Sequence, residues 1–293
     1  MITGPDRLLP EHLAERARAH VATGAPVAAP RDAATLALIR QGAGGVEVYV
    51  LRRVTTMAFA PGMHVFPGGT VGPRDLESGT GWFGPAPAVW AERFGVDEAR
   101  ARGLVLAAVR ETFEESGVLL AGGHPERRRP SRRSHPGDVV EDTSGRAWEA
   151  DRLALIDRTL SFTELLERRE LVVRADLLRG WARWVTPEFE PRRYDTAFFV
   201  AAVPPGQRTR DVGGESDRAG WIRANDALTA LVAGQILMLP PTAVVLGEID
   251  RYGTVDAVLR AADGRVIETI MPRPVLDDGA PHVVLPGEPG YLR

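Results

Sequence analysis

Residues 110–118 read Arg-Glu-Thr-Phe-Glu-Glu-Ser-Gly-Val and contain three glutamates. In a helix that turns by about 100° per residue, Glu111, Glu114 and Glu115 lie on one face. The apolar residues of the same pattern lie on the opposite face: Leu106, Val109 and Phe113. The stretch therefore predicts a helix that packs one side into a core and gathers three carboxylates on the other side.

The acidic face of this helix has two interpretations. Glu111 and Glu115 are four residues apart, and like charges at that spacing destabilise a helix by roughly 0.2–0.5 kcal/mol. Arg110 relieves only part of this repulsion, through Glu114 at the same spacing. A divalent cation would turn the repulsion into coordination, because Mg²⁺ prefers carboxylate oxygens. Most Glu-rich helices simply have a solvated acidic face, and the helix by itself favours that alternative.

The loop upstream of the helix changes this balance. Residues 66–75 read Phe-Pro-Gly-Gly-Thr-Val-Gly-Pro-Arg-Asp, which predicts a loop with unusual backbone conformations. A double glycine alone usually marks a turn, but this one precedes a helix that carries the pattern Arg-Glu-x-x-Glu-Glu-x-Gly. The combination favours the metal-binding interpretation.

The loop and the helix together resemble the Nudix box, G-x5-E-x7-R-E-U-x-E-E-x-G-U, in which U is a bulky aliphatic residue. Gly69 matches the first glycine, and residues 110–118 match the second half without a gap. Asp75 stands in place of the first glutamate at the right spacing, and Thr112 stands in place of an aliphatic residue. Between Asp75 and Arg110 lie 34 residues, where the pattern has seven, so the box carries an insertion.

An insertion inside the box is typical of one Nudix subgroup, similar to the organellar coenzyme A diphosphatases of animals. Further stretches of the chain resemble that subgroup: residues 51–53, 59–69, 184–187, 193–199 and 239–242. The resemblance implies the Nudix fold, an α/β (α+β) architecture with a mixed β-sheet sandwiched between helices. It also implies one domain over residues 1–293, divided into a core at about 33–240, a box insertion at about 76–96 and a C-terminal extension at about 241–293.

The pattern of the remaining chain agrees with such a fold. Strands and helices alternate without the regular spacing of a parallel barrel, which favours a mixed sheet flanked by helices. Apolar runs at 33–40 and 46–51, separated by glycines, predict a hairpin, and a helical pattern spans 97–116. Residues 76–95 are rich in Gly, Pro and aromatics, so we expect an inserted segment with its own small packing cluster. We expect a last helix from 240 to about 260.

The resemblance implies a metal-dependent hydrolase that cleaves the pyrophosphate bond of a nucleoside diphosphate derivative. It implies metal ligands at Glu111, Glu114 and Glu115, with Glu115 central. It implies catalytic roles for Glu114, Glu115, Arg110 and Glu215, among which Arg110 orients a glutamate. Glu215 and Glu114 are alternative candidates for the general base, and a solvated loop residue is an equally good interpretation of Glu215.

Gly68, Gly69 and Arg52 are the expected substrate-binding residues. A glycine lets the backbone pass close to the metal site, because it has no side chain. Arg52 or its neighbour Arg53 would contact phosphate, since Arg binds phosphate oxygens bidentately. For one of the two, a surface charge at the end of a strand is the preferred alternative.

Composition limits the cofactor and the partners. The chain has no Cys and no Lys, and its net charge is −3. Without thiolate ligands, the expected cofactor is Mg²⁺ or Mn²⁺. The charge balance gives no support to nucleic-acid binding, so the expected partner is a small-molecule nucleotide.

No apolar run reaches the about 20 residues of a membrane span. The N-terminal segment lacks an apolar signal core. A cytoplasmic protein, with a homodimer among its possible states, is expected.

The substrate and the function class keep alternatives. Coenzyme A derivatives, nucleotide sugars, dinucleoside polyphosphates and NADH are all candidate substrates. The coenzyme A motif is matched in part, because Gly62 is present but Ala58 stands where an Arg is usual. A non-catalytic Nudix-fold module that binds a nucleotide and regulates a partner is the second class. A structural α/β protein with an accidental acidic helix is the third.

Overall fold

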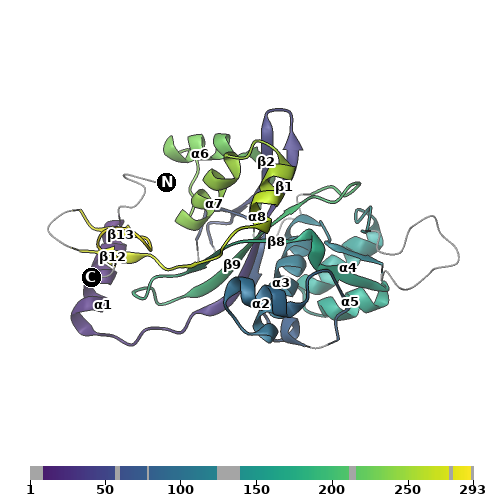
Figure 1. Cartoon of the computed structure of the whole chain (residues 1–293), viewed down its shortest axis with the longest axis horizontal. Helices are drawn as coiled ribbons and strands as arrows, with labels where there is room; N and C mark the ends of the chain where they lie inside the picture. Colours follow the sequence, from purple (N-terminus) through teal and green to yellow (C-terminus); the bar gives the residue numbers. More distant parts are fainter. Residues whose placement is uncertain are drawn as a thin grey trace, which may run out of the picture.

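Two layers of helices enclose a mixed sheet of eight strands (Figure 1). The computed structural model describes residues 9–56, 60–77, 79–123, 139–210, 216–276 and 280–291. The strand order is β10-β2-β1-β9-β8-β11, with β3 paired to β2 and β4 paired to β1. β1 and β9 run parallel, whereas β2 is antiparallel to both of its neighbours in this order. The predicted mixed sheet between helices is therefore confirmed.

The strands of this sheet are β1 (Arg31–Gly42), β2 (Gly45–Arg53), β3 (His64–Val65), β4 (Gly68–Thr70), β8 (Arg179–Val185), β9 (Tyr194–Ala202), β10 (Ser216–Arg223) and β11 (Thr269–Ile270). The α-helices are α1 (Glu11–Thr23), α2 (Pro87–Phe94), α3 (Glu98–Ser116), α4 (Arg146–Ile156), α5 (Phe162–Arg168), α6 (Ala224–Val232), α7 (Pro240–Asp250) and α8 (Val255–Asp263). A small sheet joins β5 (Trp82–Phe83), β7 (Leu171–Arg174) and β6 (Ala121–Gly123), and a hairpin joins β12 (Arg273–Val275) and β13 (His282–Val284). The predicted hairpin of the first two apolar runs is β1 and β2.

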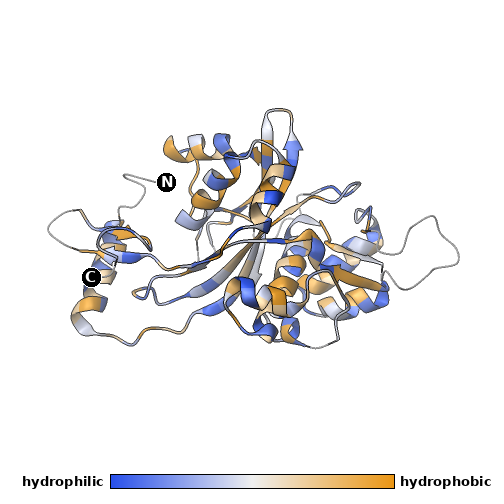
Figure 2. Cartoon of the chain, in the orientation of Figure 1, coloured by the Kyte–Doolittle hydropathy of each residue, from blue (hydrophilic) through white to orange (hydrophobic). Residues whose placement is uncertain are grey.

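The two faces of the sheet bury two apolar cores, because successive side chains of a strand point to opposite faces. Leu36 and Leu38 of β1 pack into the core beneath α2 to α5, whereas Ala37 and Ile39 pack into the core beneath α6 to α8. Figure 2 shows apolar and polar residues mixed on the helices of both layers, as expected for helices that turn one apolar face to a sheet. We call the side of the sheet that packs against α2 to α5 the α3 face.

Helix α3 forms as its sequence predicts. The side chain of Asp97 accepts a hydrogen bond of 2.8 Å from the N–H of Arg100, which caps the N-terminus. Gly117 ends the helix in a left-handed conformation with φ of 74°. Thr112, at the position where an aliphatic residue is usual, is fully buried. Its hydroxyl donates to the carbonyl of Ala108 at 2.7 Å, so the buried oxygen has a partner within the helix.

The segment after β2, which contains β3 and β4, brings the glycine loop to α3. The two strands pair with each other from Ile39 to Gly42, and beyond this β2 pairs with β3 and β1 pairs with β4. The chain therefore runs back along β2 as β3, turns, and follows β1 as β4. This turn places Gly68 and Gly69 at the edge of β1, below the C-terminal half of α3.

The box insertion does not have a packing cluster of its own, so that expectation is wrong. Trp90 and Phe94 of α2 are buried in the same core as α3, together with Phe199 of β9. The ring centroids of Trp90 and Phe94 lie 5.6 and 5.1 Å from that of Phe199. Trp90 and Phe94 thus pack against the central sheet and not in a cluster of the insertion's own.

The expected last helix is wrong as a single element, because it consists of α7 and α8. Gly253 takes a left-handed φ of 66° between them. The side chain of Thr254 then accepts a hydrogen bond of 3.2 Å from the N–H of Ala257, so α8 begins with its own cap. Both helices cover the sheet on the side away from α3. The division into core and extension at about residue 240 stays a prediction.

Candidate functional site

The carboxylate face of α3 lies against the glycine loop. The backbone N–H of Gly68 donates a hydrogen bond of 2.8 Å to Oε2 of Glu115. A Cβ atom at Gly69 would overlap the carboxylate of Glu111, so a larger residue there would displace that carboxylate from its position. Strand β4 holds the loop in place, because Gly69 pairs with Ala34 of β1. The loop is therefore shaped around two carboxylates of the helix.

Arg110 connects the helix to the acidic residue that precedes the insertion. Its Nε and Nη2 donate to the two oxygens of Asp75 at 2.9 and 2.8 Å, a bidentate geometry. Its Nη1 donates to Glu111 at 2.8 Å and to Glu114 at 3.2 Å. Asp75 is 3% exposed and also accepts a hydrogen bond of 2.8 Å from the N–H of Gly72. The two halves of the predicted box thus meet in space, and the contacts of Arg110 are those of a residue that orients glutamates.

Negative charge exceeds positive charge in this cluster. The cluster consists of Asp75, Arg110, Glu111, Glu114 and Glu115, and we call it the carboxylate cluster. Burial, and then the charge of Glu111, raise the pKa of Glu114 to about 7, although Arg110 opposes this rise. Burial disfavours the charged form of Arg110, but its hydrogen bonds to Asp75 and the nearby carboxylates outweigh this and raise its pKa. An added cation would favour the ionised form of Glu114.

The residues of the carboxylate cluster fit a hard divalent cation by two observations. The available donors are carboxylate oxygens, which Mg²⁺ and Mn²⁺ prefer. Burial, and then the charge of Glu111, raise the pKa of Glu114 to about 7, and a cation beside it would stabilise its ionised form. Within the described residues, no three acidic or His side chains are already arranged around one ion position. The carboxylate oxygens are held by Arg110 and by the N–H of Gly68 instead.

The structure brings together most of the residues that the sequence singles out. Gly68 and Gly69 of the loop lie beside the three glutamates and Arg110 of α3. Their catalytic, metal-binding and substrate-binding roles stay predictions. Glu215, the candidate general base, lies outside the described residues, as does Ala58.

Arg52 and Arg53 point to different faces of the sheet. Tyr49 and Leu51 of β2 pack on the α3 face, and alternation therefore places Arg53 on this face and Arg52 on the other. Arg52 donates to both oxygens of Asp217 at 2.7 and 2.6 Å. The predicted role of Arg52 in substrate binding is untested, and Arg53 is on the same side as the carboxylate cluster.

The contact that sequence reasoning missed lies at the C-terminal end of α3. Arg152 of α4 is 2% exposed, and its Nη1 donates a hydrogen bond of 2.8 Å to the backbone carbonyl of Glu114. In the sequence it is one Arg among many, in a helix with no distinguishing motif. Only its packing against α3 identifies it.

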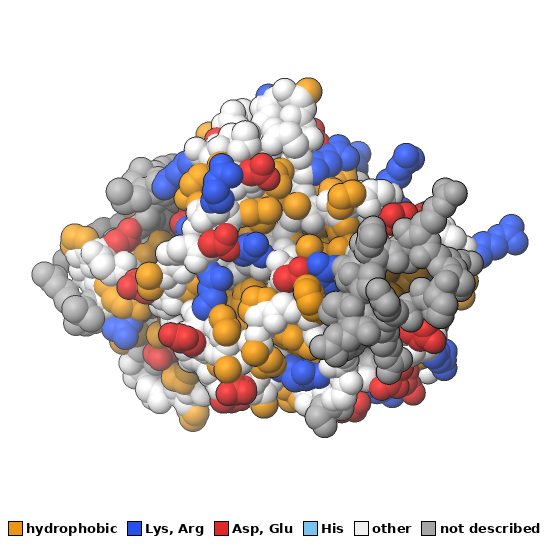
Figure 3. Space-filling model, turned by 45° about the vertical axis from the view of Figure 1, so that its right-hand side comes forward, with side chains coloured by type: hydrophobic (Ala, Val, Ile, Leu, Met, Phe, Trp, Pro, Cys, Tyr) orange, Lys and Arg blue, Asp and Glu red, His pale blue; other side chains and the backbone are white. Residues whose placement is uncertain are grey.

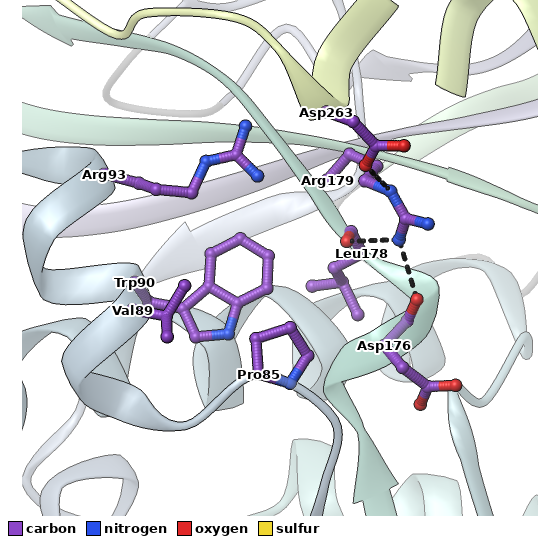
Figure 4. A pocket seen from close by; sticks show the side chains of 8 residues that line it. All are labelled: Pro85, Val89, Trp90, Arg93, Asp176, Leu178, Arg179 and Asp263. Atoms are coloured by element: carbon purple, nitrogen blue, oxygen red, sulfur yellow. Dashed lines mark hydrogen bonds and ion pairs between the residues drawn. The ribbon is translucent and has the colours of Figure 1, made fainter. Parts of the chain in front are cut away.

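A pocket of about 240 Å³ lies elsewhere, between α2, the start of β8 and the end of α8 (Figure 4). Its arginines are already engaged in contacts between these elements. Arg179 forms an ion pair with Asp263 and donates to the carbonyl of Asp176 at 2.7 Å, and Arg93 donates to the carbonyl of Ala262 at 2.6 Å. The residues that line the pocket do not belong to α3, whereas the carboxylate cluster lies in the C-terminal half of that helix. These contacts stabilise the packing of the three elements.

Comparisons with known proteins agree with this geometry. A family model described as NUDT19 Nudix domain matches residues 97–249, just over half of the chain. The chain is similar to acyl-coenzyme A diphosphatase NUDT19 of Homo sapiens, with 27% identity over 85% of this chain and 73% of that protein. The protein of the same name from Xenopus laevis is 25% identical over 84% of this chain and 71% of its own length. A solved NUDIX hydrolase from Alicyclobacillus acidocaldarius is 28% identical and superimposes with a TM-score of 0.61 over 80% of this chain and 97% of that one.

Proposed function

We propose that this chain, which belongs to the NUDT19 Nudix domain family and is a Nudix pyrophosphohydrolase, acts on a nucleoside diphosphate derivative of the coenzyme A type. The observation that carries the hydrolase mechanism is the carboxylate cluster held against the glycine loop. The substrate class rests on the relatives named acyl-coenzyme A diphosphatase. The partial coenzyme A motif, with Gly62 present and Ala58 in place of an Arg, makes the substrate the part that most needs a test.

Each residue of the carboxylate cluster has a role in this proposal. Glu111, Glu114 and Glu115 would hold Mg²⁺ or Mn²⁺, and Arg110 with Asp75 keeps the first two in place. Such an ion would neutralise charge on the phosphates and lower the pKa of a water. The water oxygen forms a bond to one phosphorus atom while the bond from that phosphorus to the bridging oxygen breaks. Glu114, one of the two candidate general bases together with Glu215, would accept a proton from that water.

The substrate test separates the candidate substrates by their products. Purified protein with Mn²⁺ or Mg²⁺ is incubated with coenzyme A, an acyl-coenzyme A, a nucleotide sugar, a dinucleoside polyphosphate and NADH, and products are identified by mass spectrometry. We expect release of a phosphopantetheine product from the coenzyme A compounds at the highest kcat/KM. Preference for another member of the panel contradicts the substrate class. Binding without any product would instead favour a non-catalytic nucleotide-binding module.

A matched pair of variants tests which arginine contacts the substrate phosphates. We expect Arg53→Ala to raise KM about tenfold, because a bidentate Arg contact to phosphate is lost. Arg52→Ala serves as the control, since its side chain is on the other face and paired with Asp217. Its KM should stay within about threefold of the wild-type value. A larger effect of Arg52→Ala would restore the sequence-based prediction.

Other properties of the chain remain proposals. Basic and acidic side chains are interspersed on the face shown in Figure 3, which supports a small-molecule substrate over a long polyanion at that face. Within the described residues, no helix has the length and apolar character needed to cross a membrane. A cytoplasmic location and a homodimer are predictions that gel filtration and cell fractionation can test.

A further inference from the structure

The end of α3 is held by hydrogen bonds from three segments: the segment before α4, α4 itself and the segment after β9. A helix leaves its last four carbonyl groups without partners inside the helix. Arg152 donates to the carbonyl of Glu114, as described above. In addition, the backbone N–H of Arg210 donates to the carbonyl of Ser116 at 3.0 Å. The hydroxyl of Thr143 donates to the carbonyl of Gly117 at 2.6 Å. Glu114 and its neighbour Glu115 thus lie in a turn whose carbonyls are tied from outside the helix.

An ion chain connects these segments. Arg152 donates to the two carboxylate oxygens of Glu149 at 3.1 and 2.5 Å, and Arg210 donates to the same carboxylate at 3.2 Å. Arg210 also donates to the carbonyl of Thr143 at 2.6 Å. We call the four residues Thr143, Glu149, Arg152 and Arg210 the helix-end clamp. It joins the segment before α4, α4 itself and the segment after β9 around one turn of α3.

The shape of the turn depends on the clamp. The guanidinium of Arg210 lies against Gly117, where a Cβ atom would come within 2.8 Å of its Cζ. The absence of a side chain at Gly117 thus allows two things: the left-handed conformation that ends the helix, and the close approach of Arg210. The arrangement leaves little freedom for the backbone that carries Glu114 and Glu115.

The use of a buried cation distinguishes this contact from ordinary capping. A neutral donor such as Thr143 suffices to satisfy a carbonyl, whereas burying a guanidinium carries a large desolvation cost. A cation at the C-terminus of a helix interacts favourably with the helix dipole. The clamp contains two cations and one anion, and it adjoins a cluster in which acids outnumber Arg110. The helix-end clamp is therefore placed where residues behind a metal site orient the ligands of the metal.

We propose that Arg152 is a positioning residue of the metal site: through the carbonyl of Glu114 it fixes the backbone that aims Glu114 and Glu115. This inference rests on the proposed function for the identity of the metal site. It predicts that loss of Arg152 weakens metal binding and kcat while it leaves KM for the nucleotide nearly unchanged.

Three variants test the positioning role in the full-length chain. Arg152→Met removes the charge and hydrogen bonds, and Arg152→Lys keeps the charge. Arg169→Met is the matched control, because Arg169 is also ion-paired and partly buried in this layer but bonds to Asp151 rather than to α3. The readouts are the Kd for Mn²⁺ by calorimetry, kcat and KM, and hydrogen exchange of the amides in residues 110–119. Circular dichroism checks that each variant is folded.

We expect Arg152→Met to weaken Mn²⁺ binding by about 10- to 100-fold and to lower kcat by a similar factor, the range typical of residues that orient ligands. Arg152→Lys should recover part of both losses. Hydrogen exchange should rise in residues 110–119 for Arg152→Met and stay unchanged for Arg169→Met. The KM of all three variants should stay within about twofold of the wild-type value.

An unchanged Kd for Mn²⁺ in folded Arg152→Met overturns the proposal. If that variant does not fold, Arg210→Met gives the decision, because it removes the guanidinium and keeps the backbone N–H on Ser116. Its Kd for Mn²⁺ should rise at least about threefold, and an unchanged value overturns the proposal. If the wild-type chain binds Mn²⁺ but cleaves no nucleoside diphosphate derivative, the proposed function fails while the positioning role is still decided by the Kd values.

Discussion

Both ends of α3 carry clusters of arginine and acidic side chains, and the two clusters differ in charge balance. At the N-terminal end, Arg183 donates to both oxygens of Asp195 at 2.8 and 2.7 Å. Arg100 of α3 forms ion pairs with Asp195 at 2.6 Å and with Asp32 at 2.5 Å. In this cluster, two arginines therefore pair with two carboxylates, and the charges balance. In the carboxylate cluster at the other end, Arg110 forms ion pairs with three acids, Asp75, Glu111 and Glu114.

The pKa of one acid in each cluster is shifted, and the two shifts have opposite directions. Burial raises the pKa of Asp195, but hydrogen bonds from Arg183 and Arg100 outweigh it and hold the pKa below its ordinary value. In the carboxylate cluster, burial and Glu111 raise the pKa of Glu114 to about 7. The balanced cluster ties α3 to β8 and β9, whereas the unbalanced one has the charge for a bound cation. One end of α3 therefore carries a structural contact, and the other end carries the proposed metal site.

The largest expected effect comes from Glu115. We expect Glu115→Gln to lower kcat roughly 10³-fold, which corresponds to about 4 kcal/mol in the activation barrier. The change keeps the size of the side chain but removes the charge that the proposal assigns to the metal. Steady-state kinetics with Mn²⁺ measures it. Glu98→Gln, at an exposed glutamate in the first turn of α3, is the control and should keep full activity. Unchanged turnover in Glu115→Gln would show that α3 does not hold the metal.

A change in the balanced cluster should reduce stability instead of catalysis. We expect Asp195→Asn to lower the free energy of unfolding by roughly 3 kcal/mol, because it leaves two partly buried arginines without their shared carboxylate. Urea denaturation followed by circular dichroism measures this loss. The kcat of the folded variant should stay within about threefold of the wild-type value. A stable but inactive Asp195→Asn protein would contradict the separation of the two clusters.

The smallest expected effect is the pH dependence of stability without divalent cations. The folded chain holds an extra proton on Glu114 between its ordinary pKa of 4.5 and about 7, so this group lowers stability as pH rises through that window. Glu114→Gln removes the effect and should gain on the order of 2 kcal/mol relative to the wild type by pH 8. Urea denaturation in EDTA across this pH range measures the difference.

Asp195 gives the opposite pH profile and serves as the comparison. Its pKa is lowered in the folded chain, so its contribution is complete above the ordinary value of 3.8 and is lost as pH falls below it. The stability difference between wild type and Asp195→Asn should therefore be constant above about pH 5 and shrink in acid. Parallel profiles for the Glu114 and Asp195 variants would contradict the difference in charge balance.

Local patterns in the sequence determined helix α3 and much of the site. The helical period alone places Glu111, Glu114 and Glu115 on one face, because side-chain direction in a helix follows directly from residue spacing. The glycines of the loop are also readable, since their lack of a side chain is a property of the sequence. The hairpin of β1 and β2 follows from two apolar runs joined by glycines.

Only the tertiary structure decided the contacts between distant segments. Arg110 meets Asp75 across the insertion, Arg53 rather than Arg52 turns to the α3 face, and Arg152 ties the carbonyl of Glu114. Strand β2 is apolar on both faces, so its sequence does not say which face meets which helix. A single Arg among many gives no local sign of its partner. Helical spacing is a local property of the chain, whereas these contacts depend on how separate segments pack together.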